Sequence, residues 1–335
     1  MNKKTKGLFA LSLTFAMLLT TVVYRSTASA VTVLGGDNRY ATALEIVKDG
    51  WAAGTAKNVV IASGMAYADA LAAAPLAYQK EKAPILLTEK SKLTAGISEE
   101  LVRLGVENVY IVGGTGVVSQ AVENELKSKV PTVKRISGVN RFETSLEIAK
   151  EAFGIKPVEV VITNGLSYAD ALSISSIAAQ KGMPILLVNN RSELSKIQKN
   201  YIANTTVYAV GGTGVLSESI VSTANATRIS GDNRYETNAA ILKQFPQDYS
   251  KVYIAKGTNT NLVDALAGSA LAALGNNPIV LVDKNSTIIP TLKDVIKENV
   301  GMSSTEVLLG GTVSQTAAAN IEELKPVPLK VLSID

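Results

Sequence analysis

A seven-residue phrase occurs three times in this chain, and it restricts the fold more than any other feature. The copies read Gly-Asp-Asn-Arg-Tyr-Ala-Thr from Gly36, Gly-Val-Asn-Arg-Phe-Glu-Thr from Gly138 and Gly-Asp-Asn-Arg-Tyr-Glu-Thr from Gly231. Corresponding residues are 93 to 102 positions apart. This period exceeds the roughly 20 to 50 residues of a solenoid repeat. Each repeat is therefore predicted to be a small domain.

Three further phrases follow the first one in every repeat. They are Tyr-Ala-Asp-Ala-Leu from Tyr67 and Tyr168 with Leu-Val-Asp-Ala-Leu from Leu262; Pro-Ile-Leu-Leu from Pro84 and Pro184 with Pro-Ile-Val-Leu from Pro278; and Val-Gly-Gly-Thr-Gly from Val112 and Val210 with Leu-Gly-Gly-Thr from Leu309. An enzyme needs one good site, whereas a protein that binds a repeating ligand gains from several sites. The repetition favours binding.

Residues 1–30 have the pattern of an export signal. Lys3, Lys4 and Lys6 precede an apolar run from Leu8 to Val23, and Ala28-Ser29-Ala30 gives the small-residue cleavage pattern. A permanent membrane span is the alternative, but the run is shorter than the ~20 residues that a spanning helix needs. We expect a secreted protein with no membrane association after the signal is removed.

Removal of this signal changes the charge balance. The signal holds four of the 33 basic residues and none of the 29 acidic ones, so 29 of each remain. A neutral chain has no net attraction for nucleic acid, and none is expected as a partner. Binding of any anionic polymer must come from locally arranged cations.

Histidine and cysteine are both absent from the sequence. Their absence excludes Ser-His-Asp and Cys-His catalysis, histidine-ligated zinc and disulfides. Paired-carboxylate and lysine chemistry remain open. No metal or cofactor is expected. The chain ends at Asp335 without an apolar tail or sorting signal, and this predicts non-covalent attachment to any cell surface.

Each repeat alternates short apolar runs with helical stretches. In the first repeat, strands are expected at 58–63, 84–88, 109–112 and 133–137, and helices at 69–80, 97–104 and 119–129. Continuous apolar strands are typical of parallel sheets that are covered on both faces. The predicted fold class is α/β, with three tandem Rossmann- or flavodoxin-like modules.

The expected domains are the signal (1–30) and modules at 31–136, 137–229 and 230–335. The short strand before each Asn-Arg phrase has a fourth copy, at 31–34, 133–137, 227–230 and 329–333. Such strands are expected to pair across module borders. Because no linker rich in proline, glycine or serine separates the modules, they are expected to form a compact trio.

One arginine per module stands where a helix should begin, namely Arg39, Arg141 and Arg234. A cation in the first turn opposes the helix dipole, which suggests an anionic partner for each. The partner is either an internal aspartate (Asp69, Asp170 or Asp264) or a carboxylate or phosphate of a ligand. Both interpretations stay open at this point.

The Gly-Gly-Thr-Gly turns at Gly113-Gly114 and Gly211-Gly212 connect a strand to a helix. They are either anion-binding turns or plain tight turns, with Ser119 and Ser217 capping the helices. Cations also lie just beyond each Pro-Ile-Leu-Leu strand, namely Lys90, Lys92, Arg191, Lys196, Lys199 and Lys284. They are either a solvated surface or a cationic groove at the sheet edge where ligands bind in open α/β folds.

Taken as a set, the four phrases resemble those of the cell wall binding repeat 2 family, over nearly all of residues 31–335. The resemblance implies three modules with pseudo-threefold symmetry that bind an anionic, teichoic-acid-like polymer of the Gram-positive cell wall. It also implies that the Ile-Leu-Leu element takes part in anchoring. This element corresponds to Ile85, Leu86, Leu87, Ile185, Leu186 and Leu187, whereas Ile279-Val280-Leu281 departs from the pattern.

The main hypothesis is a secreted, non-catalytic surface protein that binds an anionic wall polymer through three repeated modules and carries no cargo domain. Two alternatives stay open. One is a hydrolase that uses aspartates and a metal. The other is a surface-layer protein that associates with itself or with other layer proteins.

Overall fold

Three parallel sheets of four strands each form the framework of the protein. The computed structural model describes residues 31–189, 193–259 and 262–327, which belong to one compact unit. The first sheet has the order β3 (Ile85–Thr88), β2 (Asn58–Ser63), β4 (Asn108–Val112), β5 (Thr132–Ile136). The second has the order β7 (Ile185–Val188), β6 (Glu159–Asn164), β8 (Thr206–Val210), β9 (Thr227–Ile229). The predicted α/β class and three repeated modules are confirmed.

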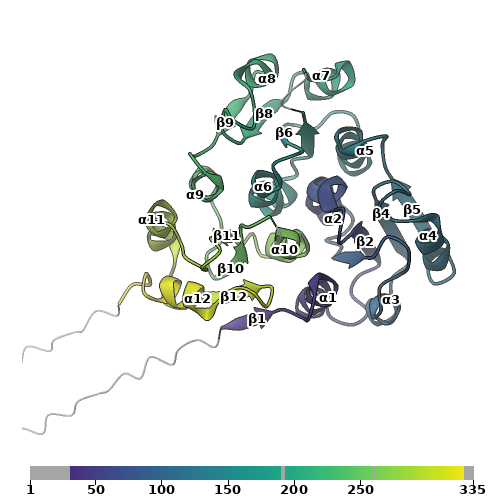
Figure 1. Ribbon diagram of the computed structural model, residues 1–335, viewed down its shortest axis with the longest axis horizontal. Coiled ribbons are helices and arrows are strands. Elements are labelled where there is room, and N and C mark those ends of the chain that lie inside the picture. Colours follow the sequence, from purple (N-terminus) through teal and green to yellow (C-terminus); the bar gives the residue numbers. More distant parts are fainter. Residues whose placement is uncertain (1–30, 190–192, 260–261, 328–335) are drawn as a thin grey trace, which may run out of the picture. The chain divides into compact units, whose positions relative to one another are not determined.

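The third sheet joins the two ends of the described chain. Its order is β11 (Ile279–Val282), β10 (Lys251–Lys256), β12 (Thr305–Leu309), β1 (Thr32–Leu34). Strand β1 pairs in parallel with β12, and Leu34 lies opposite Leu309. Figure 1 shows purple β1 beside yellow β12. Residues 32–34 thus begin the expected first module in sequence but complete the sheet of the third, so strand pairing does cross a module border. The fourth copy, 329–333, lies outside the described residues.

A long helix follows each Asn-Arg phrase and packs against the neighbouring module. These helices are α1 (Arg39–Gly50), α5 (Arg141–Phe153) and α9 (Arg234–Gln244). Helix α1 contacts β3 of the first module and α10 of the third; α5 contacts β7 and the helices that follow β2; α9 contacts β11 and α6. The same relation holds at all three borders.

Central helices from the three modules pack against one another. They are α2 (Ala73–Gln79), α6 (Tyr168–Lys181) and α10 (Leu262–Leu274), which lie side by side in the middle of Figure 1. Helix α10 is buried from Leu262 to Ala273, as expected for a helix that is apolar all round. Small side chains allow these helices to approach closely. Each central helix contacts the other two, which is the pseudo-threefold arrangement of the trio.

The first central helix differs from its counterparts. A single helix was expected over 69–80, but the structure has a 3₁₀ helix, η1 (Tyr67–Ala72), before α2. Pro75 explains the break, because it has no N–H to donate to the Leu71 carbonyl and its ring clashes with that group. Ser176 and Ala270 occupy this position in α6 and α10, which are continuous.

The remaining helices complete the modules. They are α3 (Ile97–Leu104), α7 (Lys196–Ile202) and α11 (Pro290–Asn299) after the edge strands, and α4 (Gln120–Lys127), α8 (Glu218–Thr223) and α12 (Gln315–Glu322) after the glycine turns. Helix α3 ends at Gly105, whose φ of 73° is in the left-handed region that glycine favours. The bounds of β2 and α3 agree with those expected from the sequence.

The three module borders share a geometry but differ in chemistry. Between modules 1 and 2, Glu151 accepts from Lys80 at 2.8 Å and from Lys134 at 2.6 Å. Between modules 2 and 3, the rings of Tyr208 and Phe245 meet edge to face at 5.2 Å. The side chains that join modules 1 and 2 are thus charged, whereas those that join modules 2 and 3 include an aromatic pair.

Candidate functional site at the module junctions

The Gly-x-Asn-Arg-x-x-Thr phrase builds the start of a helix. In the second module, the Asn140 side chain accepts from the N–H groups of Phe142 and Glu143, both at 3.0 Å. The Thr144 hydroxyl in turn accepts from the Gly138 N–H at 3.1 Å. The other two copies have the same bonds. The fixed glycine, asparagine and threonine of the phrase thus have local structural roles.

The arginine side chains reach beyond their own helices. Each donates from Nη1 to the carbonyl oxygen that follows the central strand of its module: Arg39 to Gly64 at 2.7 Å, Arg141 to Gly165 at 2.9 Å and Arg234 to Gly257 at 2.5 Å. All three arginines are partly exposed. The backbone contact fixes each guanidinium and leaves other donors available.

Each arginine faces the aspartate of the preceding module. Arg141 acts electrostatically on Asp69, Arg234 on Asp170 and Arg39 on Asp264. The sites therefore lie between modules, at what we call junctions 1–2, 2–3 and 3–1. Within the described ranges, none of these arginines has a carboxylate oxygen within the 4.0 Å of an ion pair. The expected alternative of an Arg-Asp pair within a module is not observed there.

Burial determines the protonation of the aspartates. It raises the pKa of all three carboxyl groups, and the arginine across the junction opposes the rise. The pKa of Asp264 reaches about 6. Asp170 and Asp264 are buried, whereas the arginines are partly exposed. At junction 2–3, the partly exposed Arg234 shares its pocket with the buried Asp170 and the exposed Asp232, so a ligand there meets the cation together with a carboxylate.

The glycine turns are the third component of each junction. A Cβ placed on Gly113 would lie 3.1 Å from Oδ2 of Asp69, and one on Gly211 would lie 3.1 Å from Oδ2 of Asp170. Both glycines have positive φ, 106° and 126°. A side chain here would be strained and would press on the carboxylate, so glycine is required. Ser119 and Ser217 cap the next helices, as expected.

A pocket of about 310 Å³ opens at junction 2–3. It is lined by Asp170 of module 2, by Gly212 and Gly214 of the turn, and by Asn233 and Arg234 of module 3. Three of the four repeated phrases therefore meet in one cavity. Its size and its mixture of backbone and charged groups suit one unit of a polar ligand.

Two tyrosines connect the junctions. The Tyr67 and Tyr168 rings are 5.2 Å apart in a T-shaped arrangement. Tyr67 donates to the backbone oxygen of Asn259 at 2.8 Å, and the Tyr168 hydroxyl accepts from Arg141 at 3.1 Å. Groups from all three modules thus meet beside the arginines.

The predicted Ile-Leu-Leu contacts need a correction. Ile85, Leu86, Leu87, Ile185, Leu186 and Leu187 are at most 1% exposed. They lie on β3 and β7 and pack into the core, so a polymer cannot touch their side chains. Any effect of this element on anchoring must come from its support of the fold.

The structure describes two of the three cations that were predicted to contact the polymer from the loops after the edge strands. Lys90 and Lys284 are exposed beyond β3 and β11, at the carboxyl ends of these strands. The Lys90 carbonyl accepts from the Ser119 N–H at 2.8 Å, which places this loop beside the end of the glycine turn. Arg191 lies outside the described residues. Polymer contact by these cations stays a prediction.

Comparison with known proteins identifies the family. The model of the cell wall binding domain 2 (CWB2) family matches residues 33–123, 135–221 and 228–319. The chain belongs to the CWB2 family. The matched segment that begins at residue 33 starts in β1, which completes the sheet of the third module. The segment that begins at residue 135 starts in β5, which completes the sheet of the first module. The CWB2 sequence repeat and the folded module are therefore offset by one strand.

Two curated relatives come from Bacillus subtilis. The N-acetylmuramoyl-L-alanine amidase LytC is 37% identical over 92% of this chain and 60% of LytC. A protein named amidase enhancer is 34% identical over 82% of this chain and 38% of the relative. The chain thus spans less than two thirds of either relative. The match to this chain is to the CWB2 binding domain.

Solved structures agree with this family assignment. Cwp8 from Clostridium difficile matches with a TM-score of 0.81 and 35% identity, over 88% of this chain and 51% of Cwp8. Cwp6 from the same organism matches with a TM-score of 0.80 and 32% identity, over 89% and 48%. These CWB2 relationships assign the protein to wall attachment at the cell wall or cell surface. In the described part of the chain, no helix is long and apolar enough to span a membrane.

Two features of the site were missed from the sequence. One is that the site residues meet between modules, which depends on packing rather than on local pattern. The other is a second arginine, Arg135 in β5 and Arg228 in β9, which contacts the glycine turn. The repeated Arg-Ile-Ser-Gly at these two positions was the available signal.

Proposed function

We propose that this protein is a non-catalytic anchor that binds an anionic, teichoic-acid-like wall polymer at its module junctions. The observation that carries the proposal is the set of three partly exposed arginines, each held by a backbone carbonyl and each without a carboxylate within ion-pair distance in the described ranges. A fixed, planar guanidinium suits the bidentate binding of phosphate groups. Lys90, Arg191 and Lys284 are the proposed outer contacts.

Repetition of the junctions suits a polymer. A phosphodiester chain presents the same group at regular intervals, so one polymer molecule is able to engage more than one junction. The second contact is then intramolecular, and linked weak sites raise the overall affinity by roughly 10² to 10⁴. The neutral mature chain accords with this view, because binding comes from local cations.

Catalysis is not part of the proposal. LytC and the amidase enhancer match this chain over its CWB2 region. We therefore propose wall attachment for this chain, and not amidase activity. Carboxylate catalysis needs two converging acids, and Asp170 and Asp232 both line the pocket at junction 2–3. The release of soluble wall fragments, measured below, therefore separates hydrolysis from anchoring. We further propose that residues 1–30 direct export and are removed.

Retention on isolated walls tests the proposal. Mature protein is sedimented with walls of the producing bacterium before and after acid extraction of the anionic polymers. We expect binding to intact walls and its loss after extraction. Equal retention on stripped walls would rule the proposal out. Release of soluble wall fragments would favour the hydrolase, and self-association in size-exclusion chromatography without walls would favour the surface-layer protein.

A further inference from the structure

The glycine turns of the three modules are held by equivalent backbone bonds. The N–H of the first turn glycine donates to the fourth strand of its sheet: Gly113 to Ile136 at 2.9 Å, Gly211 to Ile229 at 3.0 Å and Gly310 to Leu34 at 2.8 Å. The residue before each acceptor is Arg135, Arg228 and Val33, respectively. Strand register confirms that these three positions are equivalent, opposite Ile111, Ala209 and Leu308.

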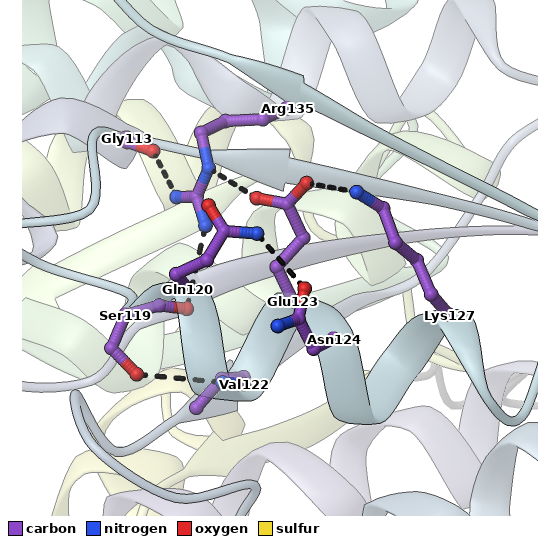
Figure 2. Close-up of polar contacts among 8 residues, drawn as sticks. All are labelled: Gly113, Ser119, Gln120, Val122, Glu123, Asn124, Lys127 and Arg135. Carbon is purple, nitrogen blue, oxygen red and sulfur yellow. Dashed lines mark hydrogen bonds and ion pairs between the residues drawn. The ribbon is translucent and has the colours of Figure 1, made fainter.

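Arg135 ties the turn to the sheet and to the next helix. Figure 2 shows its guanidinium between the Gly113 carbonyl and Glu123 of α4. The distances are 2.7 Å from Nη1 to the Gly113 oxygen and 2.8 Å from Nε to Glu123. A longer contact of 3.5 Å reaches the Ser119 carbonyl, and Lys127 holds the other Glu123 oxygen at 2.7 Å. The Arg135 side chain is 13% exposed, so these bonds are shielded from water.

Arg228 repeats this arrangement in the second module. Its Nη1 donates to the Gly211 carbonyl at 2.7 Å, and its Nη2 donates to the Leu216 carbonyl at 2.9 Å and to Glu218 at 3.0 Å. Gly211 immediately precedes Gly212, which lines the pocket with Asp170 and Arg234. The arginine therefore holds the turn from outside while the turn forms the wall of the site.

The third module lacks the arginine and the glutamates that hold the turn in the other two modules. Val33 replaces the arginine and is 45% exposed. Gln315 and Ala318 stand where Glu218 and Glu123 stand in the other modules. Between the first glycine and the capping serine, the third turn is also two residues shorter.

The short turn brings Gly310 closer to the carboxylate of junction 3–1. A Cβ on Gly310 would overlap Oδ2 of Asp264, whereas at the other junctions Val117 and Val215 are the nearest groups. Fewer backbone N–H groups remain for a ligand, and the buried acid is nearer to them. Junction 3–1 is thus less suited to an anion than the other two.

We propose that Arg135 and Arg228 are positioning residues of junctions 1–2 and 2–3, and that junction 3–1 contributes little to polymer binding. This inference rests on the proposed function and deepens it. The protein then binds the wall polymer mainly at junctions 1–2 and 2–3, while junction 3–1 joins the third module to the first.

Three matched variants test the asymmetry. Arg39→Ala, Arg141→Ala and Arg234→Ala are measured for affinity to intact walls, with thermal unfolding checked in parallel. Because weakening one of two strong sites removes part of the gain from linkage, we expect at least about tenfold weaker binding for Arg141→Ala and Arg234→Ala, and less than about threefold for Arg39→Ala. Equal losses from all three would overturn the inference but keep the proposed function. Unchanged binding by all three would remove both.

A double-mutant cycle tests the positioning role. Arg135→Val copies the third module and is combined with Arg141→Ala or with Arg234→Ala. If Arg135 acts through junction 1–2, it weakens wall binding in the Arg234→Ala background and has little further effect in the Arg141→Ala background. Equal effects in both backgrounds would show a general loss of stability and overturn the role. If Arg135→Val does not fold, Arg135→Lys is measured in the same cycle.

Discussion

The Nζ atom of Lys325 lies 3.0 Å from Oε1 of Glu306 inside the third module, and the two side chains are 6% and 2% exposed. Glu306 is on β12, where β4 and β8 have Val109 and Val207. Within the described residues, no well-aligned hydrogen bond reaches Oε1, and Lys325 is the cation next to it. Burial raises the pKa of Glu306, and Lys325 opposes that rise.

Breaking this pair should destabilise the protein strongly. Lys325→Met leaves a buried carboxylate without its cation, and we expect a loss of about 3 to 5 kcal/mol in urea unfolding. The double variant Glu306→Val/Lys325→Met, whose valine is the residue that β4 and β8 have at this position, should unfold within about 1 kcal/mol of the parent or above it. A double variant as unstable as Lys325→Met would contradict this account.

Two buried serines of α6 should be replaceable with a gain in stability. The hydroxyls of Ser173 and Ser176 are buried and have no hydrogen-bond partner among the residues that the structure describes. Since an unpaired buried hydroxyl costs about 1 to 3 kcal/mol, Ser173→Ala and Ser176→Ala should each raise the melting temperature. Ser175→Ala is the matched control, because Ser175 donates to the Leu172 carbonyl at 2.7 Å. The control should not gain stability.

The stability cost of Asp264 should depend on pH. Its pKa rises from the ordinary value of 3.8 to about 6, so the folded protein binds a proton more tightly than the unfolded chain. Stability from this group is therefore full below pH 4 and is lost as pH rises through 6, by about 3 kcal/mol in total. Relative to the parent, Asp264→Asn should become more stable between pH 4 and 7 in urea unfolding.

An aspartate with the opposite shift is the control for that measurement. The Asp248 carboxylate accepts from the Ser250 N–H at 2.8 Å, and bonds from Ser250 lower its pKa. Asp248→Asn should therefore lose stability relative to the parent as pH rises from 3 towards 5. The same trend with pH for both variants would contradict the assigned environments.

Strand β1 should stabilise the third module rather than the first. Leu34 is 6% exposed and pairs with Leu309. In Leu34→Ala, a loss of about 2 to 5 kcal/mol and faster hydrogen exchange in β12 are expected. Ile136→Ala in β5 is the counterpart and should affect β4. Faster exchange in β2 of the Leu34 variant would show that β1 belongs to the first module.

Local signals were sufficient for much of the fold. The apolar run of β2 and the amphipathic helix ending at Gly105 were predicted with their bounds. The caps at Ser119 and Ser217 and the helix starts at the arginines were also predicted. All depend on interactions within a few residues, which a single sequence displays directly.

Long-range features were not available in this way. The placement of Arg141 near Asp69 across a junction depends on how modules pack, and β1 has no local feature that selects β12 as its partner. The break at Pro75 was visible in the sequence but was not used. The Ile-Leu-Leu strands show the converse, since a repeated phrase reflected a buried core and not a contact surface.

Strand β1 is synthesised early, but it can pair only after β12 has been synthesised, because both belong to the third sheet. A chain stopped after the second module would hold two complete sheets, an unpaired opening strand and an Arg39 with no Asp264 to face. The third sheet can therefore close only after synthesis has passed β12, so the pairing of the first and last strands of the described chain makes the third module depend on both ends of that region.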